Sequence, residues 1–85
     1  MINQYNPNVV SAPGDTIIEL LKDRSITIND LSIQIKQTED FVNKLIIGEK
    51  IITQKIALQL EEIFGVPALF WINREIDYRI YIQDK

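Results

Sequence analysis

Hydrophobic positions recur at spacings of three and four along most of the chain, which is the period of a helix that buries one face. Five segments carry this pattern, at about 14–24, 28–35, 39–47, 54–64 and 67–74. The side chains on their predicted inner faces are Ile17, Leu20, Leu21, Leu31, Ile35, Val42, Leu45, Ile46, Ile56, Ala57, Leu60, Ile63, Phe64, Phe70 and Trp71. The pattern therefore predicts an all-α protein, a compact five-helix bundle.

Capping residues mark where several of these helices begin and end. Thr27 and Thr38 precede the second and third segments, and Thr27 forms a capping-box-like pair with Asp30 three residues later. Gly65 lies just past the fourth segment, where a left-handed residue is favoured. The second and third segments are short and closely spaced, so residues 27–47 have the arrangement of a helix-turn-helix.

The two ends of the chain are less regular. Residues 1–12 hold three asparagines and one proline without a helical period, and we expect an irregular arm there, followed by a single domain at 13–85. In the tail, apolar residues from Ile76 to Ile82 alternate with polar ones as in a strand, although Ile76 and Ile80 also share a helix face. We favour a continued helix.

The tail also carries apolar and aromatic side chains that a domain of this size does not readily cover. They are Tyr78, Ile80, Tyr81 and Ile82. Two interpretations stay open: these residues form a partner surface, such as the seam of a dimer, or they pack against the first helix.

The composition removes several classes of function. The chain has no histidine and no cysteine, so the commonest general base and the usual zinc ligands are missing and disulfides are excluded. No phosphate-binding loop, dinucleotide fingerprint or nucleophile elbow is present. We therefore expect no enzyme, no metal site and no cofactor. Without a long apolar run or a secretion-signal pattern, we expect no membrane association and a cytoplasmic protein.

The charge of the chain bears on nucleic-acid binding. The net charge is −3 at pH 7. Avid non-specific binding needs many cations close to phosphates, so this balance argues mildly against it. A local DNA-reading face is still compatible with the sequence.

Three stretches carry a pattern that is more specific than a helix-turn-helix alone. They are PGDTIIELLKDRSIT, TEDFVNKLIIGEKIIT and ALQLEEIFGVPALFWINREIDYRIY. The Pro-Gly opening and the Gly-x-Pro-x-x-Phe-Trp close are the most specific parts. Together with the lead-in NQYNPNVV they resemble, over about residues 5–82, the Cro/phage-repressor (XRE) helix-turn-helix family, and within it antitoxins of the HigA/VapI type.

The resemblance implies a lambda-repressor-like fold and a transcriptional regulator that binds operator DNA as a homodimer. Many antitoxins of this type repress their own promoter and also neutralise a small ribonuclease toxin, so both are expected partners. The alternative is a protein-interaction or dimerisation module on a helix-turn-helix scaffold, with weak or no DNA binding.

The resemblance also implies which residues meet DNA. They are Thr27, Thr38, Glu39, Asp40, Asn43, Lys44 and Lys50. We expect Lys44 to bond a guanine and Lys50 to meet a phosphate. Thr27 is either a phosphate contact or a plain helix cap, and the two roles are compatible. For Glu39 and Asp40 we favour a solvated face at the positive end of the helix over contacts to cytosine.

Several positions depart from the family pattern. Ile28 stands where a polar residue, often glutamine, follows the helix cap, and Lys36 stands where the turn often has glycine. A lysine at positive φ costs roughly 1 kcal/mol. Across residues 27–50 three lysines oppose four acidic residues, so the segment expected to read DNA is net negative by one. This charge balance favours the alternative of a domain that keeps the scaffold but reads DNA weakly, or only as a dimer.

Overall fold

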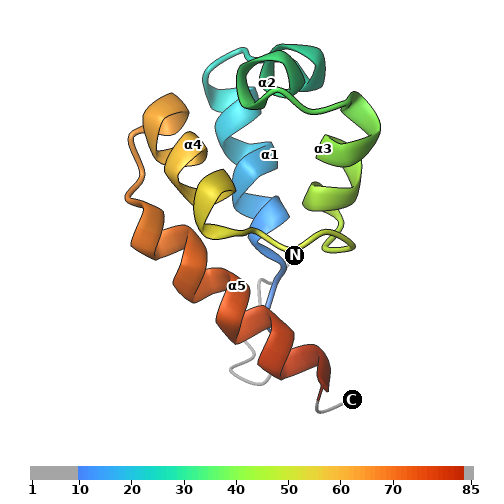
Figure 1. Ribbon diagram of the computed structural model, residues 1–85, viewed down its shortest axis with the longest axis vertical. Coiled ribbons are helices and arrows are strands. Elements are labelled where there is room, and N and C mark those ends of the chain that lie inside the picture. The colour runs from blue at the N-terminus through green and yellow to red at the C-terminus, as the bar shows by residue number, and fades with distance from the viewer. Residues whose placement is uncertain (1–9, 84–85) are drawn as a thin grey trace, which may run out of the picture.

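The computed structural model describes residues 10–83, which form five helices joined by short connectors (Figure 1). The helices are α1 (Pro13–Asp23), α2 (Ile28–Ile35), α3 (Glu39–Ile46), α4 (Gln54–Phe64) and α5 (Ala68–Gln83). The predicted all-α, five-helix architecture is confirmed, and each boundary of the first four helices lies within one residue of its predicted place. Of the predicted N-terminal arm, residues 1–9 lie outside the described residues, and residues 10–12 are not helical.

Threonine hydroxyls fix the starts of three helices. Thr27 Oγ1 accepts a hydrogen bond from the backbone N–H of Asp30 at 3.0 Å, and Asp30 Oδ2 accepts one from the N–H of Thr27 at 3.1 Å. This is the predicted capping box at the start of α2. The hydroxyls of Thr38 and Thr53 each accept from the backbone N–H three residues ahead, at 3.0 and 3.3 Å. The first turns of α2 and α3 are therefore defined by local hydrogen bonds.

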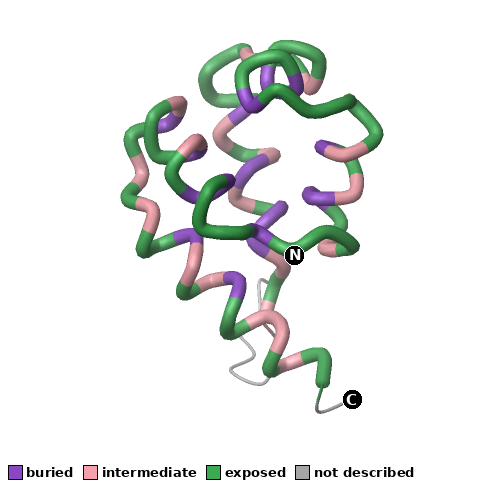
Figure 2. The backbone as a smooth tube through the Cα atoms, viewed as in Figure 1, coloured by how far each residue is buried: buried purple, intermediate pink, exposed green. Residues whose placement is uncertain are grey.

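One hydrophobic core lies between the helices (Figure 2). Its buried members are Ile17, Leu21, Leu31, Ile35, Val42, Leu45, Ile46, Ile52, Ile56, Ala57, Leu60, Phe64 and Trp71. Within this core, α1 packs against α3 and α5, while α4 packs against α2 and α5. Trp71 anchors α5: its indole N–H donates to the carbonyl of Val66 at 3.3 Å, and its ring lies 6.3 Å from that of Phe64.

Three details of the predicted core are different in the structure. Phe70 is 39% exposed, so the prediction that it completes the core is wrong; its ring instead packs edge-on against Trp71. Leu20 and Ile63 are only half-buried at the margin of the core. Conversely, Ile52 is buried although it lies in the connector between α3 and α4.

The tail is helical, as favoured, because α5 runs from Ala68 to Gln83 without a break. Its last turns extend beyond the other four helices (Figure 1). The buried residues of α5 are only Trp71 and Glu75, so its remaining apolar side chains point in several directions. This scattering is why the tail sequence shows no clear helical period.

Gly14 explains the Pro-Gly opening of the domain. At this position α1 lies directly against the end of α3, and a Cβ would be 1.8 Å from the carbonyl oxygen of Ile46. No side chain larger than hydrogen fits without moving one helix. Pro13, also buried, occupies the first position of α1, where its missing N–H costs no hydrogen bond.

Candidate nucleic-acid interface

The turn between α2 and α3 has the geometry of a helix-turn-helix in spite of lacking glycine. Lys36 closes α2 in the left-handed conformation, with φ 59° and ψ 44°. The backbone N–H of Lys36 donates to Ile33 at 3.1 Å, and that of Gln37 donates to Ser32 at 2.9 Å. Lysine therefore adopts the strained conformation that the sequence suggested, at a cost of roughly 1 kcal/mol.

The polar residues predicted to meet DNA lie together on the solvent side of α3. Thr38, Glu39, Asp40 and Asn43 are exposed, and Lys44 is half-buried. The opposite side of the helix is buried in the core through Val42, Leu45 and Ile46. Helix α3 thus presents a continuous polar face, and Thr27 is exposed at the start of the neighbouring α2.

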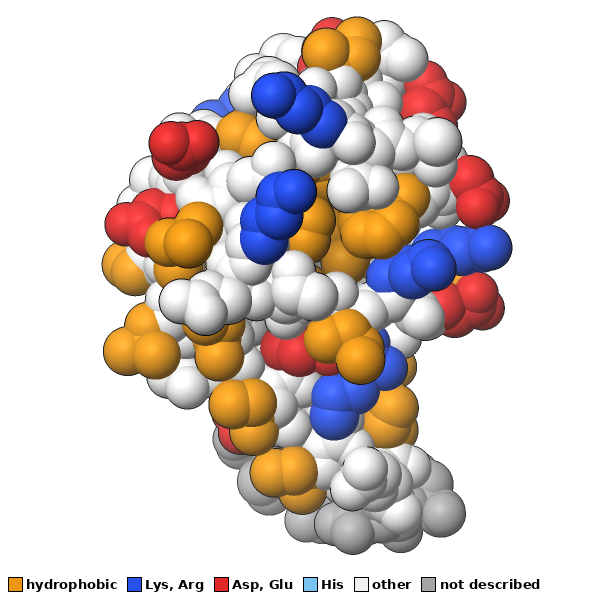
Figure 3. Space-filling model, in the orientation of Figure 1, with side chains coloured by type: hydrophobic (Ala, Val, Ile, Leu, Met, Phe, Trp, Pro, Cys, Tyr) orange, Lys and Arg blue, Asp and Glu red, His pale blue; other side chains and the backbone are white. Residues whose placement is uncertain are grey.

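Each of the two acidic side chains on this face has a polar partner. Lys44 Nζ lies 3.2 Å from Asp40 Oδ2, one helical turn away. Asn29 Nδ2 donates to Glu39 Oε2 at 2.6 Å and so links the first turn of α2 to the first turn of α3. Figure 3 shows charges of both signs side by side along the edge formed by α3. The pair of Asp40 and Lys44 is largely exposed, so it is weak and easily exchanged for another partner.

Lys50 reaches the same region from the connector between α3 and α4. Its Nζ lies 5.8 Å from the ring centroid of Phe41, within the range of a cation–π contact. An open hollow of about 430 Å³ adjoins this contact, and its lining residues are Gln37, Phe41, Glu49, Lys50, Ile51, Thr53, Lys55 and Ile56. Lys55 thereby adds a second cation beside Lys50. Lys55 was not among the site residues predicted from the sequence. Its place in the first turn of the predicted fourth helix, close in sequence to Lys50, could have identified it as a second cation near the site.

Comparison with known proteins gives a match in structure. No family model matches the sequence, and no curated protein matches it significantly. The fold is similar to that of the Pseudomonas aeruginosa antitoxin HigA, solved with the higBA promoter: the identity is 25%, the TM-score is 0.77, and the match covers 85% of this chain and 79% of that one. The chain has a HigA-type helix-turn-helix fold.

Two further structures support the same HigA-type fold. An addiction module antidote protein of the HigA family from Coxiella burnetii is 28% identical, with a TM-score of 0.72, over 82% of this chain and 77% of that one. PA4674 from Pseudomonas aeruginosa, solved with its operator DNA, is 24% identical, with a TM-score of 0.79, over 88% of this chain and 82% of that one. The resemblance found in the sequence is confirmed.

A second surface of the HigA-type fold lies on α5. Ile80 is 55% exposed and Ile82 37% exposed, while Tyr78 and Tyr81 are half-buried. The four residues predicted as a partner surface are thus not equally available. Two other exposed side chains, Leu69 and Ile76, extend the apolar surface of the helix. Figure 3 shows hydrophobic side chains gathered along the part of the surface that α5 forms.

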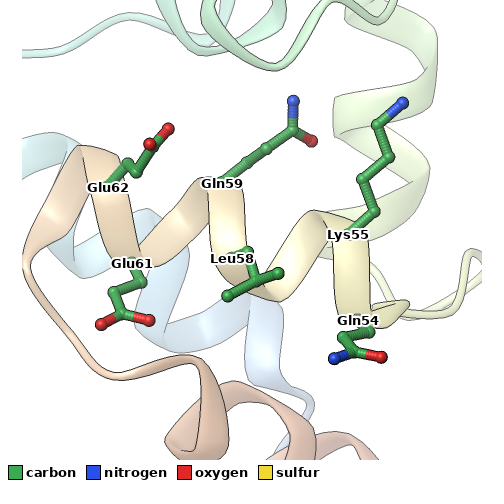
Figure 4. Close-up of a pocket in the computed structure, with 6 residues that line it drawn as sticks. All are labelled: Gln54, Lys55, Leu58, Gln59, Glu61 and Glu62. Atoms are coloured by element: carbon green, nitrogen blue, oxygen red, sulfur yellow. The ribbon is translucent and has the colours of Figure 1, made fainter.

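An open groove runs along α4. Its volume is about 830 Å³, and it is lined by Gln54, Lys55, Leu58, Gln59, Glu61 and Glu62. Gln59 and Lys55 point to one side of the helix, whereas Glu61 and Gln54 point to the other (Figure 4). Two of these side chains have structural roles: Gln59 donates to the carbonyl of Ile35, and Glu61 accepts from the first backbone N–H of α5.

The described residues form neither a metal-binding group nor a membrane-spanning helix. Between Val10 and Gln83, no group of three or more histidine, cysteine, aspartate or glutamate side chains is placed to hold a metal ion. None of the five helices there is long and apolar enough to cross a membrane.

Proposed function

We propose that this protein is a sequence-specific DNA-binding regulator of the antitoxin type, which represses its own promoter. The observation that carries the proposal is a well-capped helix-turn-helix with a polar outer face, set in a fold shared with an antitoxin that was solved with its promoter. This pairing of site and scaffold supports DNA reading by α3.

In the proposed mode of binding, α3 lies in the major groove. Its polar face carries Asn43 and Lys44, which have the donors needed for adenine and for guanine O6 or N7. Thr27 at the start of α2 and Lys50 after α3 would contact phosphates on either side of the groove. Thr38 lies at the front of the reading helix, where its hydroxyl already caps α3.

Asp40 and Glu39 affect how tightly the outer face of α3 would bind DNA. On binding DNA, Lys44 exchanges its bond to Asp40 for a base or phosphate, which leaves the carboxylate close to the negative duplex. Because the acids oppose the phosphates, non-specific binding should be weak, and tight binding should require a matching base sequence. Glu39 stays bonded to Asn29 and acts on the scaffold more than on DNA.

The partners follow from the same proposal. We expect a homodimer, because a helix-turn-helix that reads two half-sites gains affinity from both. We also expect a small ribonuclease toxin as a second protein partner and action in the cytoplasm. The exposed apolar side chains of α5 offer the surface for such protein contacts.

A second candidate function is a protein-interaction module that has kept the scaffold but reads DNA weakly or not at all. Two observations favour it: the acids on the outer face of α3 and the exposed Leu69, Ile76 and Ile80 on α5. In this case self-association or toxin binding would survive Lys44→Ala but not polar replacements of the apolar residues on α5.

A fluorescence-anisotropy titration separates the two candidates. The full chain is titrated into a labelled duplex taken from immediately upstream of its own gene and into a scrambled duplex, each at two salt concentrations. The regulator predicts saturable, salt-sensitive binding that prefers the upstream duplex and is weakened by Lys44→Ala. Equal, weak binding of both duplexes at low salt would leave only the interaction module.

A further inference from the structure

The far end of α5 is joined to the connector that follows the reading helix. Arg79 Nη2 donates a hydrogen bond to the carbonyl oxygen of Lys50 at 3.1 Å, across 29 positions of sequence. On the same helix, Arg79 also pairs with Glu75 one turn earlier. These two bonds hold the Arg79 side chain in one place, between its own helix and the connector.

Glu75 holds Arg79 in this orientation. The carboxylate of Glu75 is almost completely buried, with the residue 5% exposed, and it accepts from Nε of Arg79. The guanidinium also lies 5.3 Å from the ring centroid of Tyr78. Only one partner of this ion pair is buried, since the side chain of Arg79 is 26% exposed and that of Glu75 is 7% exposed. Burial of the carboxylate costs solvation free energy, and its charge-assisted bond to Nε of Arg79 offsets that cost and fixes the direction of the guanidinium.

The connector is tied to α3 at its other side. The backbone N–H groups of Glu49 and Lys50 both donate to the carbonyl of Lys44, at 2.8 and 3.2 Å. Gly48, at φ 88°, lies against Tyr78, so that a Cβ there would be 2.9 Å from Cε2 of the ring. The segment from Gly48 to Lys50 is therefore held between the end of the reading helix and the last turns of α5.

The side chain of Lys50 leaves this clamped backbone toward the reading helix. Its ammonium group lies over Phe41, in the first turn of α3. A single cation–π contact is a weak restraint on a long, flexible side chain. The place of the Lys50 backbone therefore sets which positions beside the reading helix the ammonium group can reach.

We propose that Arg79, oriented by Glu75, is a positioning residue for DNA binding, which sets Lys50 against a phosphate beside the reading helix. This inference rests on the proposed function. It makes α5 more than a protein-contact surface: a partner that displaces Arg79 from the connector would also lower the affinity for DNA.

The test measures DNA affinity and its salt dependence for Arg79→Gln, Lys50→Ala and the double variant of the full chain. Loss of one phosphate contact lowers the slope of log K against log salt by about 0.9 and the affinity by about fivefold near 0.15 M salt. We expect Lys50→Ala to show this loss of affinity and of slope. Arg79→Gln should bind DNA about two- to fivefold more weakly than the wild type, with a smaller salt slope. The double variant should bind DNA no more weakly than Lys50→Ala.

Arg74→Gln is the matched control. Arg74 lies on the same helix and bonds the carbonyl of Ala12 at 3.0 Å and the hydroxyl of Ser11 at 3.2 Å, far from the connector in sequence. It should leave the salt slope unchanged. Hydrogen exchange of the free protein supplies a readout without DNA: Arg79→Gln should speed exchange of the Glu49 and Lys50 amides, and Arg74→Gln should not. Arg79→Lys, which keeps a donor, should restore part of the affinity.

Several outcomes would overturn the inference. A folded Arg79→Gln variant with wild-type affinity and slope would show that the tether does not position Lys50. Additive losses in the double variant would show that the two residues act independently. If the wild-type chain binds no DNA, the proposed function fails at that first step and the inference falls with it, whereas the other two results leave the proposed function standing.

Discussion

Replacement of Gly14 by alanine is predicted to destabilise the protein, against the usual trend for such a change. In an ordinary helix position, alanine is more favourable than glycine by up to about 1 kcal/mol. At Gly14 the added methyl group would lie 1.8 Å from the carbonyl oxygen of Ile46 and 2.4 Å from its carbonyl carbon. Both contacts are far inside van der Waals distance, and both involve backbone.

The size of the effect follows from how the overlap can be relieved. The carbonyl belongs to the last residue of α3, so that relief requires α3 to move away from α1 or the first turn of α1 to unwind. Overpacking of this kind costs typically about 1–3 kcal/mol. We expect a net loss near the upper end, about 2–3 kcal/mol. For a domain of this size that corresponds to a fall in Tm of about 10–20 °C.

Thermal unfolding followed by circular dichroism measures this loss, with Gly65→Ala as the matched control. Gly65 closes α4 at φ 76°, and a methyl group added there would have nothing within 4 Å, so its replacement should cost only the left-handed strain, about 1 kcal/mol. A Gly14→Ala variant that is as stable as the wild type, or more stable, would refute the close packing of α1 on the end of α3.

Three further changes test the helix-turn-helix itself. Lys36→Gly should raise the free energy of unfolding by about 1 kcal/mol in a urea titration, because glycine relieves the left-handed strain in the turn; an unchanged midpoint would argue against that conformation. Thr27→Ala should lower the stability by about 1 kcal/mol through loss of the capping box, whereas Thr27→Ser should retain most of it. Asp40→Asn should raise the affinity for any duplex by about two- to fivefold at low salt, because it frees Lys44 and removes a charge that repels phosphates; an anisotropy titration that shows weaker binding would contradict this role.

The sequence predicted most of the fold because the deciding signals are local. Thr27, Thr38 and Gly65 are capping residues whose partners lie within a few positions, and the structure has each at the predicted helix end. The spacing of apolar residues in the first four helices likewise reports a single buried face. The strained Lys36 could also be anticipated, because the family that the sequence resembles often has glycine at this position of the turn.

Contacts between distant segments could not be predicted in the same way. The bond from Arg79 to the Lys50 carbonyl and the contact of Gly14 with Ile46 join residues about 30 positions apart, and no local pattern reports them. The exposed Phe70 has a related cause: Trp71 beside it fills the core at this turn of α5, and the ring of Phe70 packs edge-on against it from outside.

The candidate site could be predicted from the sequence only in part. The sequence placed the residues of α3 on one face, but it did not predict that Glu39 would bond Asn29 across the turn. The pairing of Asp40 with Lys44 follows the ordinary spacing of four residues and could have been found. Which of these polar groups meets DNA depends on the duplex and stays a prediction.

The most direct test of the central claim is an NMR titration of the isotopically labelled full chain with the duplex from upstream of its own gene. We predict that backbone amide shifts change at Thr27, along the outer face of α3 and near Lys50, while those at the C-terminal end of α4 stay constant. A scrambled duplex should cause smaller changes that vanish with added salt. Shift changes confined to α5, or none on α3 at saturating DNA, would contradict the claim that this helix-turn-helix reads DNA.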